Sequence, residues 1–160
     1  MNLQIKNVGF EDVPKWRLLS KEYDDYVREV TPDLTEWYEG NNDTSISFDA
    51  YMTAKISKNE AFMAMDERGE CCGIIAISRK NNNITFFGTF HEYDVLSVGD
   101  FLIQYALSEL DANRSIQMNE LKINAKQIQE IYVLLDKFEF VYQGEVLENG
   151  VPVNCMVRNP

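Results

Sequence analysis

The stretch from Ile84 to Leu110 places a buried strand, a polar loop and an amphipathic helix in direct succession. Residues 84–90 are mostly apolar or β-favouring, and residues 91–97 form the loop. The apolar residues of the helix recur at helical spacing: Val98, Phe101, Leu102, Tyr105, Ala106 and Leu110. The first amides of such a helix have no intrahelical acceptor and lie at the positive end of its dipole, so the unit can hold an anion. A phosphate is expected over the backbone amides of Ser97, Val98, Gly99 and Asp100.

The chain of 160 residues is 45% hydrophobic, which predicts a single domain, residues 1–160, with a sizeable core. Its formal net charge of −11 opposes binding to nucleic acid or to an anionic membrane, and no basic segment is apparent. The start of the chain lacks the apolar core of a signal peptide and no segment could span a membrane, so a cytoplasmic location is expected. Cys71, Cys72 and Cys155 lack metal-ligand spacing, so we expect buried thiols and neither a disulfide framework nor a metal site.

Hydrophobic spacing and turn signals divide the rest of the chain into strands and helices. The expected strands are 3–8, 61–66, 71–79, 84–90, one ending near 123, 140–147 and 151–158. The expected helices are one capped by Asp12 and ending at Val30, one over 48–56 capped by Ser47, the helix 98–110, and one capped by Asn124 and reaching Phe138. A helical crossover joins the strands on either side of the helix 98–110, so they run parallel if adjacent, whereas the hairpins are antiparallel. This predicts a single-domain α+β fold with a mixed, mostly antiparallel sheet flanked by helices.

Residues 33–45, between the first two expected helices, are polar and rich in turn formers, yet they include Trp37 and Tyr38. This segment either faces a substrate or is a solvated loop that the two aromatic side chains anchor to the body of the protein. We favour the anchored loop, because loops often combine an aromatic anchor with acidic residues.

The order of strands and helices, with a strand–loop–helix unit in the middle and a hairpin at the end, resembles the GNAT superfamily of N-acetyltransferases over nearly the whole chain. In that family a six-residue loop wraps the pyrophosphate of acetyl-CoA. It has Gln or Arg first, Gly fourth, and Gly or Ala sixth. Residues 94–99 take its place here, where Gly99 fits the pattern and Asp94 and Ser97 depart from it.

The C-terminal part of the chain carries a second set of matching positions. Asn124 and Phe140 match an asparagine before the last helix and a phenylalanine after it. The family has a tyrosine where this chain has Leu135 and a glycine where it has Glu139. Tyr132 lies three residues before Leu135, on roughly the same face of the helix.

The resemblance implies acetyl-CoA as co-substrate. In the family, the central strand separates from its parallel neighbour, and backbone N–H groups exposed there bind pantetheine and polarise the thioester carbonyl. The corresponding residues here are Phe87, Gly88 and Thr89. The other cofactor-binding residues implied by the resemblance are Val95, Ser97, Val98, Gly99, Asp100 and Asn124.

Direct acetyl transfer needs a proton acceptor for the amine and a proton donor for the departing thiolate. Glu92 and His91 follow the end of the central strand and are the candidate bases. His91 is the only histidine, and a loop residue hydrogen-bonded to backbone is the competing interpretation. Tyr132 is the candidate acid, although an aromatic residue on the apolar stripe of a helix more often packs in the core.

The predicted function is acetyl-CoA-dependent N-acetyl transfer to a primary amine of a small molecule or protein. Acidic residues fall where the family builds the acceptor side of its cleft: Asp24, Asp25, Glu29, Glu36 and Glu39. They favour a cationic acceptor, unless they are simply a solvated acidic surface. A homodimer is left open. The alternative function is a non-catalytic GNAT-fold module that binds a ligand or a protein partner, which the departures at Asp94, Ser97, Leu135 and Glu139 favour.

Overall fold

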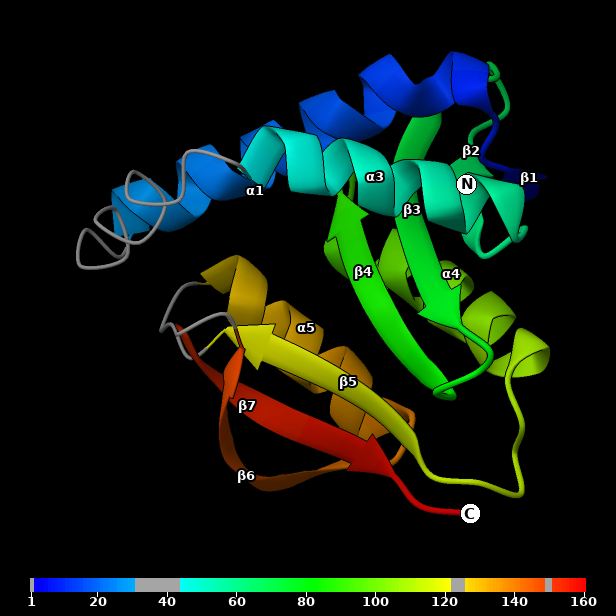
Figure 1. Ribbon diagram of the computed structural model, residues 1–160. Helices are drawn as coiled ribbons and strands as arrows, with labels where there is room; N and C mark the ends of the chain where they lie inside the picture. The colour runs from blue at the N-terminus through cyan, green and yellow to red at the C-terminus, as the bar shows by residue number, and fades with distance from the viewer. Residues whose placement is uncertain (1, 31–43, 122–125, 149–150) are drawn as a thin grey trace.

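A computed structural model describes residues 2–30, 44–121, 126–148 and 151–160 (Figure 1). The elements in chain order are β1 (Gln4–Asn7), a 3-10 turn η1 (Phe10–Asp12), α1 (Val13–Val30), α3 (Thr44–Ser57), β2 (Ala61–Met65), β3 (Cys71–Ser78), β4 (Asn83–Thr89), α4 (Val95–Glu109), β5 (Ile116–Leu121), α5 (Lys126–Lys137), β6 (Phe140–Glu148) and β7 (Val151–Arg158). This order confirms the expected sequence of strands and helices.

Two of the expected helix starts are wrong by about one turn. Helix α3 begins at Thr44, so Ser47 lies inside the helix and does not cap it. Helix α4 begins at Val95 and not at Val98, because the Asp94 side chain accepts a hydrogen bond from the Leu96 amide and caps the helix there.

The seven strands form one sheet in the order β1-β2-β3-β4-β5-β7-β6. Among the described strands, only the pair β4 and β5 runs parallel, and every other neighbouring pair is antiparallel. The crossover through α4 between β4 and β5 requires this parallel direction. The expected mixed α+β sheet is therefore confirmed.

The helices cover the sheet on both faces. Helices α4 and α5 lie behind the sheet in Figure 1, whereas α1 and α3 cover the upper part of its front face. Trp16 of α1 is fully buried and contacts Phe86 of β4 edge-on, with 5.6 Å between ring centroids. The opposite face is filled by α4 residues such as Val98, Leu102 and Ala106, which are fully buried. Strand β4 is thus fixed between two packed layers.

A β-bulge in β4 separates this strand from β5. On the β3 side, Ala76 pairs with Phe86 and Ile77 pairs with Ile84, which leaves Thr85 as the extra residue. A bulge bends the strand that carries it and increases its twist. On the β5 side, the pairing includes Asn83 and Ile84 only, so the two strands diverge from Thr85 onward (Figure 1). We call the β5-facing side of residues 85–89 the open edge of β4.

Asn82 fixes the point from which the two strands diverge. Its side chain is 1% exposed, and it lies directly before β4. Its Nδ2 donates to the carbonyl oxygens of Asp111 and Ser115 at 3.0 and 3.1 Å, and its Oδ1 accepts from the Asp111 amide at 2.8 Å. These bonds tie the start of β4 to the connection that leads into β5.

Candidate functional site

The open edge of β4 presents backbone amides that strand pairing does not use. The Phe90 amide donates to the Cys72 carbonyl of β3 at 2.9 Å. Because successive residues of a strand direct their N–H groups to opposite sides, Gly88 also faces β3, whereas Phe87 and Thr89 face the gap toward β5. Within the described residues, no strand pairs with β4 at these two positions. Of the three residues expected to offer amides, Phe87 and Thr89 therefore have the required direction.

Gly99 brings α4 and α5 close to the open edge. A Cβ atom at this position would lie 2.5 Å from Leu134 Cδ1 of α5 and 2.9 Å from Phe87 Cζ of β4. Real Cβ contacts are not this short, so only glycine fits here without a shift of its neighbours. The fit of Gly99 to the family pattern thus has a packing reason in this chain.

The N-terminus of α4 carries its own carboxylate. Asp94 accepts a hydrogen bond from the Leu96 amide at 3.3 Å and one from the Ser97 hydroxyl at 2.7 Å. The Val98 amide donates to the Asp94 carbonyl at 3.0 Å, as it does in a regular helix. The amides of Val98, Gly99 and Asp100 therefore lie within the hydrogen-bonded helix, contrary to the expected phosphate position. The first-turn amides are those of residues 95–97.

A shallow groove extends from this helix end along α4 and α5. Its volume is about 930 Å³, and it is lined by Asn2, Leu3, Gln4, Leu96, Ser97, Asp100, Phe101, Gln104, Val133, Leu134 and Lys137. Lys137 of α5 forms an ion pair with Asp100 of α4 inside the groove. One cation of the groove is thus already neutralised by a neighbouring carboxylate.

His91 lies two residues after the open edge and contacts Glu22 of α1. Its ring is 78% exposed, and its Nδ1 lies 2.7 Å from Oε1 of Glu22. The hydrogen bond to Glu22, and then the negative charge of Glu22, raise the pKa of His91. Glu92, the other candidate base, is exposed. The expected alternative, a histidine bonded to backbone through its ring, is not what the structure shows, since the partner is a side chain.

Tyr132 is half-buried on α5. Its hydroxyl oxygen accepts a hydrogen bond from Asn154 Nδ2 of β7 at 2.8 Å, and burial raises the pKa of the phenol. Leu135, at the position of the family's tyrosine, is fully buried in the core. Glu139 has a φ of 68°, a left-handed conformation that favours glycine, and the family has glycine there. The backbone here thus has a conformation that glycine adopts more readily than glutamate.

Several expected residues fall outside the described part of the structure. These are Asn124, Trp37, Tyr38, Glu36 and Glu39, together with the side chains of Asp24 and Glu29. Asp25 is described and forms an ion pair with Lys21 at 2.6 Å. All three cysteines are free and buried, as expected.

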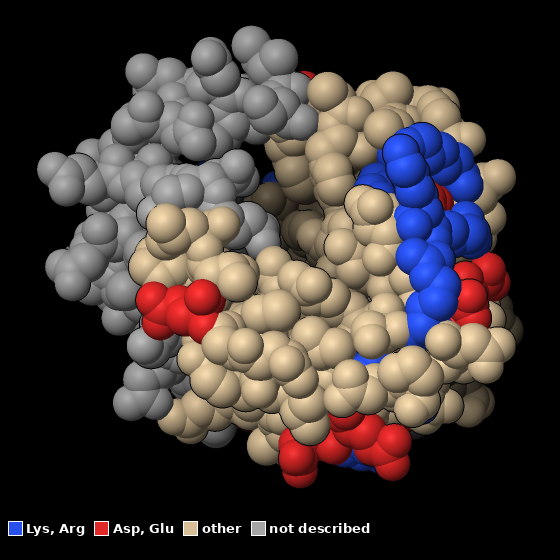
Figure 2. Space-filling view, turned by 60° about the horizontal axis from the view of Figure 1, so that its bottom comes forward, with Lys and Arg blue, Asp and Glu red and all other residues tan. Residues whose placement is uncertain are grey.

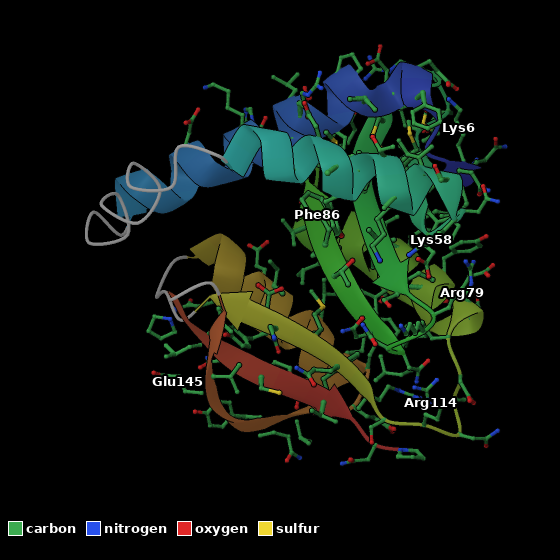
Figure 3. All side chains as sticks on the ribbon, in the orientation of Figure 1. Lys6, Lys58, Arg79, Phe86, Arg114 and Glu145 are labelled. Carbon is green, nitrogen blue, oxygen red and sulfur yellow. The ribbon has the colours of Figure 1, made fainter. Side chains whose placement is uncertain are left out.

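Basic side chains gather on one side of the molecule, which the sequence did not indicate. Figure 2 shows a continuous band of Lys and Arg on this face, and Lys58, Arg79 and Arg114 lie at the corresponding edge in Figure 3.

Within the described residues, no helix is long and apolar enough to cross a membrane. The described residues also contain no cluster of His, Cys, Asp or Glu side chains that could hold a metal ion.

Neither a protein-family model nor a curated protein matches the chain. Among solved structures, a PaiA N-acetyltransferase from Thermoplasma acidophilum in complex with coenzyme A has a TM-score of 0.68 at 13% identity, with 100% of both chains covered. A GNAT superfamily phosphinothricin acetyltransferase from Sinorhizobium meliloti in complex with acetyl-CoA has a TM-score of 0.65 at 17% identity, with 99% of this chain and 88% of that chain covered. The chain has the GNAT acetyltransferase fold.

A third structure with the GNAT fold is a spermidine N-acetyltransferase from Vibrio cholerae in complex with CoA and spermine. It has a TM-score of 0.57 at 14% identity, with 97% of this chain and 94% of that chain covered. The architecture that the sequence resemblance implied is thus confirmed as a fold. The residue roles that it implied stay predictions.

Glu22 is the polar residue that the sequence interpretation missed. Its side chain is 29% exposed and contacts His91, which is 69 residues later in the chain. A signal for its placement was available, because Glu22 follows Leu19 by three residues and so lies near the sheet-facing side of α1. Its contact with His91 could not be read from the sequence.

We predict that Gly99→Ala lowers the free energy of unfolding by about 1–3 kcal/mol, because the added methyl group overpacks the contact between α4, α5 and Phe87. Urea denaturation measures the change. Ser108→Ala, at an exposed position of the same helix, is the control. Ala106→Gly would open a cavity and is therefore not used. A stability of Gly99→Ala equal to that of Ser108→Ala would contradict the close packing at Gly99.

Proposed function

We propose that this protein is an acetyl-CoA-dependent N-acetyltransferase that moves an acetyl group directly to a primary amine. The observation that carries the proposal is the open edge of β4, where the Phe87 and Thr89 amides face the gap toward β5 and the Phe87 ring packs against Gly99 of α4. Acyl transfer needs donors aimed at the carbonyl oxygen on which negative charge develops, and fixed backbone amides meet this need whatever the side chains are. Structures of the same fold in complex with CoA or acetyl-CoA support the proposal.

The residues of this chain can be assigned to parts of the co-substrate. The Phe87 and Thr89 amides would hold the pantetheine and polarise the thioester carbonyl. The first-turn amides of Val95 and Ser97 would face the pyrophosphate, joined by that of Leu96 once the Asp94 carboxylate is displaced. The next turn of α4, which contains Val98, Gly99 and Asp100, supports these amides. Acetyl-CoA supplies the thioester whose acyl carbon the amine attacks.

The acceptor is a primary amine of a small molecule or a protein. Structures with the same fold include a spermidine and a phosphinothricin acetyltransferase, and both names denote acetylation of an amine. The formal net charge of −11 favours a cationic acceptor over an anionic one. Tyr132 would protonate the departing thiolate, because a phenol carries its proton at neutral pH and its oxygen accepts from Asn154. The cytoplasmic location and a homodimer stay predictions.

A second candidate function is a GNAT-fold module that binds a ligand or a protein partner without catalysis. The observation that favours it is the Asp94 carboxylate, which already occupies the anion-binding end of α4. A pyrophosphate would have to displace this carboxylate or bind next to it. The two functions differ in one measurable property, which is stabilisation of the fold by acetyl-CoA.

We predict that acetyl-CoA at about 100 times its Kd stabilises the native state by about 2.7 kcal/mol, because it binds only the folded chain. For a domain of this size the thermal midpoint should rise by roughly 5–10 °C. Differential scanning calorimetry on ligand-free protein measures the shift, and adenosine diphosphate should give part of it. No shift with millimolar acetyl-CoA would exclude the acetyltransferase and leave the binding module.

We predict that Asp94→Asn binds acetyl-CoA about fivefold more tightly, since removing one like charge near a solvated pyrophosphate is worth about 1 kcal/mol. Asparagine caps helices as well as aspartate does, so the fold should keep its stability. Isothermal titration calorimetry gives the affinity. Glu145→Gln makes the same charge change on β6 at the far edge of the sheet and should leave the affinity unaltered. Equal affinities of the two variants would show that the phosphates do not bind at Asp94.

A further inference from the structure

Glu22 makes two hydrogen bonds to the same residue at the end of the open edge. Its Oε1 lies 2.7 Å from the backbone nitrogen of His91 and 2.7 Å from the ring Nδ1. An exposed histidine would otherwise be free to change its rotamer. Two bonds to one oxygen instead fix both the backbone and the ring of His91 against α1.

We propose that Glu22 is a positioning residue that holds His91 as the proton acceptor for the incoming ammonium group. This inference rests on the proposed acetyl transfer. It assigns the base to His91 rather than to Glu92, and it adds a residue of α1 to the site.

Chain continuity places this pair near the end of the open edge. His91 lies two residues after Thr89, in the turn that follows β4, and its amide points to Glu22 of α1. Proton acceptor and oxyanion donors thus belong to one short segment, residues 87–91.

The hydrogen bond also selects the ring nitrogen that can act as the base. A carboxylate only accepts hydrogen bonds, so Nδ1 of His91 carries the proton that Glu22 binds. In the neutral ring this leaves the lone pair on Nε2. Because the His91 side chain is 78% exposed, Nε2 can take a proton from the ammonium group of the incoming substrate and can later release this proton to water. Glu92 is also exposed, but no described side chain orients it.

The charges around His91 suit a base that works near neutral pH. Glu22 of α1 and Glu92 of its own loop are the charged groups that act on the ring, and both raise its pKa. A higher pKa makes neutral His91 a stronger acceptor for an ammonium whose pKa is about 10. Because only neutral His91 can accept a proton, activity should fall as the pH drops through the pKa of His91.

The proposed acetyl transfer uses a single base and begins with the protonated amine. His91 Nε2 takes one proton from the ammonium group and passes it to solvent. The neutral amine attacks the acyl carbon, so a C–N bond forms and the C–S bond breaks. The amine nitrogen loses a second proton, and the leaving thiolate gains one. The products are the amide, the free thiol and one proton in solution.

The test compares Glu22→Gln with Glu11→Gln, which makes the same change at an exposed site of η1. NMR follows the single histidine of the chain in both variants. Release of CoA thiol from acetyl-CoA is measured against pH with spermidine and with a lysine-containing peptide. We expect Glu22→Gln to lower the pKa of His91 and to move the acid side of the pH profile down by the same amount. We also expect Glu22→Gln to lower turnover by about 10- to 100-fold. Glu11→Gln should change neither the pKa of His91 nor the turnover.

His91→Gln should remove the acid side of the profile and lower turnover by about 100-fold or more. In the unmodified protein, nitrogen-15 shifts should place the proton of neutral His91 on Nδ1. The inference is wrong if that proton lies on Nε2, or if Glu92→Gln moves the profile in place of Glu22→Gln. It is also wrong if acetyl-CoA stabilises the protein but no thiol is released. If acetyl-CoA stabilises none of the variants, the proposed function fails and this inference fails with it.

Discussion

Parallel pairing between β4 and β5 is limited to two residue pairs: Asn83 pairs with Gln117, and Ile84 pairs with Met118. The bulge at Thr85 bends β4 away at that point, while α4 crosses over to start the neighbouring strand. The buried Asn82 cluster on one side of the open edge keeps the divergence point fixed.

The helix after β4 brings a second requirement into the same region. Its glycine lets α4 pack closely against Leu134 of α5 and the ring of Phe87. Its cap is a carboxylate, which stabilises the helix by interaction with the dipole but competes with any phosphate for the same end. The described residues thus combine strand amides that no described strand pairs with and a helix end that is already capped by a carboxylate.

Much of this fold could be predicted from the sequence because hydrophobic spacing encodes which faces are buried. The order of elements and the parallel direction of β5 followed from periodicity and from the length of the crossover. Helix α4 starts three residues before the expected Val98, although Asp94 before Val95 is a cap signal and Val95, Val98 and Leu102 share a buried face.

Other features depend on tertiary structure that local patterns do not contain. The bulge at Thr85 is a matter of register between two strands, and no residue of β4 marks it. The contact between Glu22 and His91 joins residues 69 positions apart. Only the packing of α1 on the end of β4 brings them together. The sequence therefore identified His91 as a candidate but could not identify its partner.

Two-dimensional nitrogen–proton NMR during a titration with coenzyme A shows whether the open edge binds acyl-CoA. We expect the amide signals of Phe87 and Thr89 to move most within β4, together with those of residues 95–97, because these N–H groups gain acceptors. Gly88, whose amide faces β3, should move less. Binding that shifts other signals and leaves Phe87 and Thr89 in place would contradict the assignment of the open edge as the acyl-CoA site.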